Sequence, residues 1–337
     1  MPVTIRDVAK HLNLSITTVS RALDGYDDVA EQTRARVIQA AHELGYAPSR
    51  AARQLRRQRT DALGYILPVT TPRFADPFFS EFIAGLGDET ASHGFDLLVS
   101  TAPPGEAAEQ AIYRRWVMSR QVDGMILSRM RLEDWRVRFL HKSNFPFIVL
   151  GHCQMPINFP LIEVDGRSGF KTLVAHMVAR GHARIAYIGA SPELTLQADR
   201  FTGYQEGLEA AGIPYEAALV AEGNLTRDGG YRAAQQLLDL PNPPTAIVAV
   251  NDLAAIGAMS AARERGLEVG RDLAIAGFDG IEDSKHTQPP LTTLNQPVYE
   301  IARRLVSMLL KLIKDEPLTE QQIVLEPELI VRASTGG

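Results

Sequence analysis

The sequence predicts a small all-α helix-turn-helix head followed by a larger α/β body, in which two doubly wound parallel-sheet subdomains enclose a cleft. The first sixty residues hold three short amphipathic segments at helical spacing. After Thr60, short apolar runs alternate with amphipathic segments, a pattern typical of parallel sheets with helices on both faces. Residues 61–337 are too many for one such sheet, and the runs at 61–69 and 183–190 resemble the first strands of two similar halves.

The composition limits the class of protein. A chain of 337 residues with 45% hydrophobic side chains can bury a large core, but no apolar run approaches the roughly 18 residues that span a membrane. Charged residues among the first ten leave no room for a signal peptide, so we expect a cytoplasmic protein. Cys153 is the only cysteine, which excludes an intramolecular disulfide and a thiolate metal cluster, and we expect neither a metal nor a cofactor.

Charge is divided unevenly along the chain. The net charge is −5, yet residues 1–60 carry ten Lys or Arg against six Asp or Glu, a balance of +4 that leaves −9 for the rest. A basic head on an acidic body favours a polyanion such as double-stranded DNA, bound at one end only. A solvated charged surface without a partner is the alternative that charge alone leaves open.

The head is predicted to contain three helices, near Thr4–His11, at Ile16–Leu23 and at about Glu31–Leu44. Asn13 tolerates the left-handed backbone that a tight turn requires, and Ser15 can cap the second helix. Two short helices joined by such a turn form a helix-turn-helix unit, whose second helix offers hydroxyl groups and an arginine to a major groove. Three-helix units without a DNA-binding role are also common, so the pattern alone leaves both interpretations open.

A basic hinge is predicted at residues 48–60. Five arginines lie between Arg50 and Arg59 with no acidic residue among them. A helix of roughly eight residues cannot hold itself together in water, but contact with phosphates favours it, so the segment should order on DNA. Leu55 is its one bulky apolar side chain, and a basic linker with Leu55 packed on the body is the alternative.

The body divides into strands and two halves. We expect strands at Ala62–Pro68, Phe95–Ser100, Gly124–Leu127, Phe147–Leu150, Ile185–Gly189, Leu219–Ala221, Ala246–Val250 and Leu273–Phe278. An extended run at 288–294 leads into a helix at Val298–Ile313, where the chain should return to the first half. The expected domains are a head at 1–47, the hinge at 48–60 and a core at 61–337. Within the core, the N-subdomain covers about 61–163 and 292–323, and the C-subdomain about 164–291 and 324–337.

Polar side chains at strand ends should face each other across the cleft. A guanidinium group, an amide and a carboxylate, at Arg200, Asn251 and Asp279, can together grip vicinal hydroxyl groups. Aromatic residues in the loop at 73–79, namely Phe74, Phe78 and Phe79, can stack on the apolar face of a sugar. The alternatives are that Asn251 and Asp279 only cap helices and that the phenylalanines belong to the core.

Several sequence strings resemble those of lactose-repressor (LacI) family regulators. In the head and hinge they are TIRDVA at 4–9, SITTVSRAL at 15–23, TRARV at 33–37, LGYAP at 44–48 and PSRAARQLR at 48–56. In the body they are DGMI at 123–126, VDG at 164–166, GHARIA at 181–186, DRFTGY at 199–204, ND at 251–252 and GFD at 277–279. The resemblance therefore covers the whole chain and implies a periplasmic-binding-protein-like core.

The resemblance implies roles for residues in the head and hinge. Base-reading positions fall on Ile16, Thr17 and Arg21, and phosphate-contacting positions on Thr4, Ser15, Thr18, Ser20, Thr33 and Tyr46. The hinge positions that contact DNA are Ser49, Ala52, Arg53, Leu55 and Arg56, with Leu55 inserted between base pairs from the minor groove. Asn13 replaces the family's usual turn glycine, and Ala30 replaces a frequent capping serine, which should cost the third helix about 1 kcal/mol.

The resemblance also implies effector contacts in the cleft. It assigns ligand contact to Arg200, Asn251 and Asp279, and places Phe74, Asp76, Phe78, Asn224 and Gln296 in ligand-lining segments. Cys153 lies where the lactose repressor has an acidic ligand residue, so a galactoside preference is not supported. The sequences of the segments 75–79 and 129–138 resemble those of alpha-glucoside-type repressors. This resemblance implies an oligosaccharide as the effector.

These observations predict a ligand-responsive transcription regulator, most simply a repressor of carbohydrate-uptake or catabolic genes that a sugar inducer releases. We expect a homodimer on a pseudo-palindromic operator, without membrane contact, and no tetramer, because no apolar heptad segment follows the core. One alternative is a nucleoside- or nucleobase-responsive regulator with co-repressor logic. The other is a carbohydrate-active enzyme, for which no phosphate loop, H-E-x-x-H string or cysteine–histidine signature is found.

Overall fold

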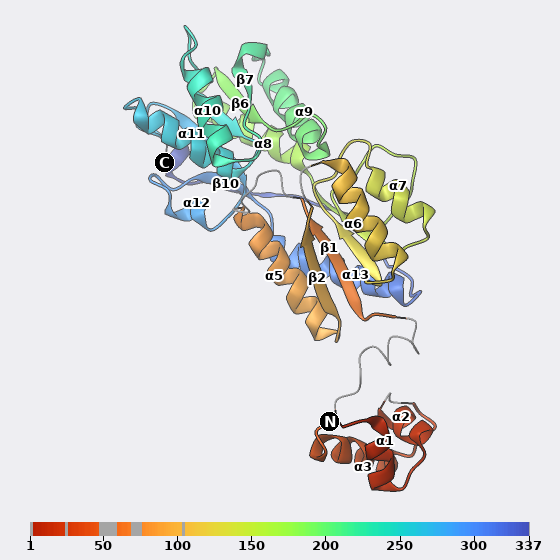
Figure 1. The fold of residues 1–337 in the computed structure, drawn as a ribbon. Coiled ribbons are helices and arrows are strands. Elements are labelled where there is room, and N and C mark those ends of the chain that lie inside the picture. Colours follow the sequence, from red (N-terminus) through yellow and green to blue (C-terminus); the bar gives the residue numbers. More distant parts are fainter. Residues whose placement is uncertain (1–2, 24–25, 47–58, 69–75, 103–104, 337) are drawn as a thin grey trace. The chain divides into compact units, whose positions relative to one another are not determined.

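The computed structural model describes residues 3–23, 26–46, 59–68, 76–102 and 105–336 (Figure 1). The chain forms two compact units, Met1–Asp61 and Ala62–Gly337. Residues 48–58, most of the expected hinge at 48–60, lie outside the described residues. None of the described helices is both long and apolar enough to cross a membrane.

The first unit is a three-helix head built from α1 (Ile5–Leu12), α2 (Ile16–Leu23) and α3 (Glu31–Glu43). Each helix contributes a fully buried valine to one small core. These valines are Val8, Val19 and Val37. The core explains why such short helices are stable: packing of their apolar faces supplies what an isolated helix of this length lacks.

Single residues determine the turn between the first two helices of the head and the way its helices begin. Asn13 ends α1 with φ 53°, in the left-handed region that asparagine tolerates, so the tight turn forms without a glycine. Ser15 begins α2, because its Oγ accepts a hydrogen bond from the Thr18 amide at 3.0 Å. Ala30 begins α3 and makes no side-chain cap.

The second unit contains two six-stranded sheets within its described residues. The first sheet has the order β11-β5-β4-β3-β1-β2, and all its neighbouring strands are parallel. Its strands are β1 (Ala62–Leu67), β2 (Asp96–Thr101), β3 (Gly124–Leu127), β4 (Phe147–Leu150), β5 (Leu161–Val164) and β11 (Gln322–Leu325). One face packs against α5 (Pro77–Ser92) and α13 (Val298–Ile313), and the other against α6 (Glu106–Met118) and α7 (Trp135–Lys142).

The second sheet repeats this plan with the order β12-β10-β9-β8-β6-β7, in which the edge strand β12 is antiparallel to β10. Its strands are β6 (Ile185–Gly189), β7 (Val220–Glu222), β8 (Ala246–Ala249), β9 (Ala274–Asp279), β10 (Thr292–Asn295) and β12 (Glu328–Ile330). Its helices are α8 (Gly166–Ala179), α9 (Thr195–Ala210), α10 (Arg227–Leu238), α11 (Asp252–Glu264) and the short α12 (Asp283–His286). Single 3-10 turns lie at Ala217–Leu219 and Ala333–Thr335.

The predicted fold class is confirmed: a helix-turn-helix head precedes two parallel-sheet subdomains. The return to the first half differs in detail from the expected position near residue 292. Strand β10 still pairs with β9 in the second sheet, so the chain returns only after Asn295. Within 105–336 the chain passes between the halves three times, from β5 to α8, from β10 to α13 and from β11 to β12.

Candidate effector cleft and nucleic-acid interface

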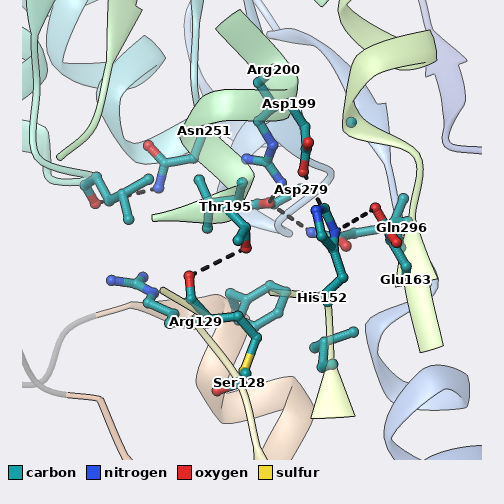
Figure 2. Close-up of a pocket in the computed structure, with 18 of the residues that line it drawn as sticks. Ser128, Arg129, His152, Glu163, Thr195, Asp199, Arg200, Asn251, Asp279 and Gln296 are labelled. Carbon is teal, nitrogen blue, oxygen red and sulfur yellow. Dashed lines mark hydrogen bonds and ion pairs between the residues drawn. The ribbon is translucent and has the colours of Figure 1, made fainter. Parts of the chain in front are cut away.

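A cavity lies between the two halves of the core, and its empty space, open solvent at the mouth included, is about 780 Å³. Its lining comes from the carboxyl ends of strands and the helix starts that follow them, the usual place for a ligand in open α/β sheets. Figure 2 shows the side chains that point into it. The lining includes Asp76, Phe78, Ser128, Arg129, His152, Glu163, Thr195, Asp199, Arg200, Leu225, Asn251, Asp279 and Gln296.

Arg200 reaches the cavity from α9 and is held from two sides. Its Nη1 donates a hydrogen bond to the Val250 carbonyl, and its guanidinium carbon lies 3.8 Å from the centre of the Phe278 ring. Its Nη2 lies 3.9 Å from Asp279 Oδ1, and burial lowers the pKa of the guanidinium. The fork is therefore positioned before any ligand arrives, which reduces the entropy lost on binding.

Asp279 ends strand β9 in an unfavourable conformation. Its φ of 118° lies in a region that favours glycine, and such a residue costs on the order of 1–3 kcal/mol. Gln296 Nε2 donates a hydrogen bond to its Oδ1 at 2.7 Å, yet burial raises the pKa of the carboxyl to about 7 despite the nearby Arg200. Residues kept in this state are typical of ligand-binding sites.

Asn251 caps a helix and also lines the cavity, so the two interpretations of this residue are compatible. Its Oδ1 accepts a hydrogen bond from the Ala254 amide at 3.0 Å, so it caps α11, and its Nδ2 donates to the Leu225 carbonyl at 3.3 Å. The residue also lines the cavity. Its side chain is thus fixed by the backbone while it faces the ligand space.

The first half contributes an ion pair and an aromatic ring. Arg129 Nη2 donates to Asp76 Oδ2 at 2.7 Å, while Asp76 Oδ1 accepts from the Phe78 amide at 3.1 Å and begins α5. Burial raises the pKa of Asp76. Phe78 lines the cavity and also packs against the core, whereas Phe79 is buried, so the core interpretation holds for Phe79.

A group of three titratable residues lies on the same wall, and the sequence did not single it out. His152 follows β4, Glu163 lies in β5 and Asp199 lies in α9. The His152 Nδ1 is 3.0 Å from Glu163 Oε1 and 3.8 Å from Asp199 Oδ2 (Figure 2). Contact with Glu163 raises the pKa of His152, and burial raises that of Asp199.

The expected effector residues separate into two groups. Six of them line the cavity, namely Asp76, Phe78, Arg200, Asn251, Asp279 and Gln296. Asn224 does not: it is exposed beside α10, and its neighbour Leu225 takes the place in the lining. Phe74 lies outside the described residues.

The helix α2 presents the expected DNA-reading surface only in part. Ile16 is 46% exposed and Thr17 is also exposed, as base contact requires. Arg21 pairs with Asp28, whose Oδ1 accepts from its Nε at 3.1 Å, and its guanidinium lies 4.6 Å from the centre of the Tyr26 ring. Ser20 is only 5% exposed, so a phosphate contact by its side chain is not evident.

The remaining expected DNA contacts are placed as follows. Thr4 is exposed, and its amide and hydroxyl both donate to Asp7 Oδ2, at 2.8 and 2.7 Å. Thr18, Thr33 and Tyr46 are half-buried in the head. The hinge residues lie outside the described residues, and they are Ser49, Ala52, Arg53, Leu55 and Arg56.

Comparisons with known proteins agree on one family. The family model "Bacterial regulatory proteins, lacI family" matches residues 4–49, and a periplasmic binding protein-like domain matches residues 174–335. The HTH-type transcriptional repressor CytR of Escherichia coli strain K12 is 35% identical, over 98% of this chain and 96% of its own.

Two solved structures share the fold over nearly the whole chain. The lac repressor dimer bound to operator and an anti-inducer has a TM-score of 0.87 at 28% identity, and both chains are covered completely. The complex of the transcriptional regulator CelR with cellobiose has a TM-score of 0.76 at 29% identity, with 98% of this chain and 99% of the other covered. The chain belongs to the lacI family of bacterial regulatory proteins, and it is a ligand-responsive, DNA-binding transcription regulator rather than an enzyme.

Proposed function

We propose that this chain is a repressor that binds operator DNA through its head and is released when a carbohydrate occupies the cleft. The observation that carries the proposal is the arrangement of Arg200, Asn251 and Asp279 around one cavity, beside the ring of Phe78. A sugar presents hydroxyl groups that both donate and accept, together with apolar C–H faces. The cavity offers partners for each of these features.

Different side chains of the cavity would bind different parts of the sugar. The Arg200 guanidinium can donate two parallel hydrogen bonds to vicinal hydroxyl oxygens, and the Asp279 carboxylate can accept from a hydroxyl group. Phe78 supplies an apolar face for the ring. The CelR structure, which contains cellobiose, supports an oligosaccharide as the ligand class.

We further propose a homodimer whose two heads read a pseudo-palindromic operator in the cytoplasm. Two-fold symmetry in the protein requires matching half-sites in the DNA. The hinge segments would order in the central minor groove, where Leu55 would unstack a base step. The operator-bound lac repressor, which is a dimer, supports this arrangement.

The test begins with the ligand. A thermal-shift panel of mono- and disaccharides, nucleosides and nucleobases should yield a disaccharide that raises the Tm of the full chain. That sugar should then lower retention of a promoter fragment in a gel-shift assay by roughly 5- to 150-fold, the usual range of allosteric coupling. Nucleobase hits without any sugar hit would overturn the carbohydrate assignment. If the full chain retains no promoter fragment at moderate salt, the proposal that it acts by binding operator DNA is overturned.

A further inference from the structure

His152, Glu163 and Asp199 form a compact group whose members come from both halves of the core. His152 and Glu163 belong to the first half, after β4 and in β5, and Asp199 belongs to α9 of the second half. One ligand atom from each residue lies within 4.8 Å of the others. A tetrahedral ion held at about 2.0–2.1 Å separates its ligand atoms by roughly 3.3 Å, close to the 3.0 and 3.8 Å between His152 Nδ1 and the two carboxylates.

The charges of the group are balanced only in part within the protein, because Arg167 and Arg200, the two arginines that act on Asp199, are each bonded elsewhere. Two carboxylates face one imidazole, and Asp165 adds further negative potential at Asp199. Arg200 is the nearest cation on α9, but its guanidinium is engaged with the Val250 carbonyl and lies beside Asp279. The three side chains are between 22% and 29% exposed, so water compensates this charge only in part.

The Nδ1 atom of His152 lies close to a carboxylate without a well-directed hydrogen bond. Among the described residues, the buried Nδ1 of His152 has no hydrogen-bond partner, although it lies 3.0 Å from Glu163 Oε1. The contact therefore has a suitable distance and an unsuitable direction for N–H···O. A cation placed between the imidazole nitrogen and the two carboxylates would give all three groups a partner.

We propose that His152, Glu163 and Asp199 bind a divalent transition-metal ion, zinc being the first choice for one imidazole and two carboxylates. Neutral imidazole and carboxylate oxygen are both good zinc ligands, and three protein ligands leave a coordination position open. All three residues line the effector cavity, so the open position faces the ligand space. The sequence alone led to the expectation of no metal site, because the chain has one cysteine and its histidines are scattered.

A metal at this place would also join the two halves. It would tie strand β5 to helix α9 across the cleft, in addition to the short antiparallel bridge that Arg131 and Leu194 form between the halves. We expect zinc to alter operator affinity by favouring one arrangement of the halves, a consequence that rests on the proposed function. Metal binding itself does not rest on it.

The experiment uses the full chain after dialysis against a chelator. Calorimetric titration with Zn²⁺ should show one equivalent per chain, and Co²⁺ should give the visible absorption of a four-coordinate site. His152→Ala should weaken Zn²⁺ binding at least ~10-fold and remove the Co²⁺ bands. Glu163→Gln and Asp199→Asn should each weaken binding, and these near-isosteric variants answer the question if His152→Ala fails to fold.

A matched control is available on the surface. His286 and Glu282 form an exposed pair at 3.5 Å, and His286→Ala should leave the one-equivalent binding unchanged. Absence of saturable binding, or equal binding by wild type and His152→Ala, would overturn the site. A gel shift with and without Zn²⁺ then tests the coupling. Unchanged operator affinity with bound metal would overturn the coupling alone, whereas absence of any operator binding would count against the proposed function and not against the site.

Discussion

At the scale of single residues, Asp279 combines two unfavourable features. Its backbone is in a region that favours glycine, and burial raises the pKa of its carboxyl to about 7. Both features lower the stability of the fold, as is common for residues held in place for function. The cost is understandable if the carboxylate is held ready for a ligand.

The raised pKa predicts a change in stability with pH. The folded state holds the Asp279 proton more tightly than the unfolded state, where the pKa is near 3.8, so its contribution is present below about pH 4 and is lost as the pH rises through 7. Asp279→Asn removes this dependence. Relative to wild type, the variant should gain on the order of 2 kcal/mol in free energy of unfolding between pH 5 and pH 8.

Urea unfolding at the two pH values measures this difference. Asp228→Asn, which replaces an exposed acidic residue on α10, is the control and should show no such gain. A parallel pH dependence in wild type and Asp279→Asn would show that Asp279 is ionised throughout that range.

Arg200 allows a test of recognition at the same scale. Lysine keeps the charge but lacks the planar fork that contacts the Val250 carbonyl and stacks on Phe278. Arg200→Lys should therefore weaken the sugar found in the screen at least ~10-fold by calorimetry, while operator retention without sugar is unchanged. Equal loss of both activities would indicate a general structural role for Arg200.

At the scale of elements, the helices of the head differ in how they begin. Ser15 caps α2 through the Thr18 amide, whereas Ala30 offers α3 no side-chain acceptor. Ala30→Ser should supply that acceptor and stabilise the head by about 1 kcal/mol. Scanning calorimetry of the full chain should show a rise in the transition of the head alone. A rise of equal size in the core transition, or a fall in the head, would contradict the capping argument.

Regular elements were predictable from the sequence where the apolar pattern was strong. The expected ranges Ile16–Leu23, Gly124–Leu127 and Ile185–Gly189 agree with α2, β3 and β6 residue for residue. The strands β5, β11 and β12 were missed, because each is a short run that contains a polar residue, namely Glu163, Gln322 and Glu328. Such strands owe their conformation to pairing with distant neighbours, which local pattern does not report.

Cleft residues were predictable from the sequence where they follow or end a strand that the sequence itself predicts. Asn251 and Asp279 directly follow or end buried strands, and both line the cavity. His152 satisfies the same rule after β4 and could have been selected with them. Glu163 lies in an unrecognised strand, and Asp199 faces the cavity only because α9 packs across it, so tertiary structure was needed for both.

At the scale of the whole molecule, the head and the cleft should be separable by mutation. Leu55→Ala shortens the proposed hinge wedge without touching a residue of the cavity. Operator affinity should fall, because each unstacked base step is stabilised by the inserted side chain, while the affinity for the sugar is retained. Gel shift and calorimetry on the same preparation measure the two quantities. Unchanged operator affinity would remove Leu55 from the mechanism.

The last passage of the chain between the two halves, from β11 to β12, has a consequence for the stability of the core. Strand β11 forms an edge of the first sheet and β12, three residues later, forms an edge of the second. The following residues also matter, because the buried Ser334 hydroxyl donates to the Ile275 carbonyl and accepts from the Thr292 amide. Truncation before residue 322 would therefore remove an edge strand from both sheets at once, so the two halves depend on one C-terminal segment.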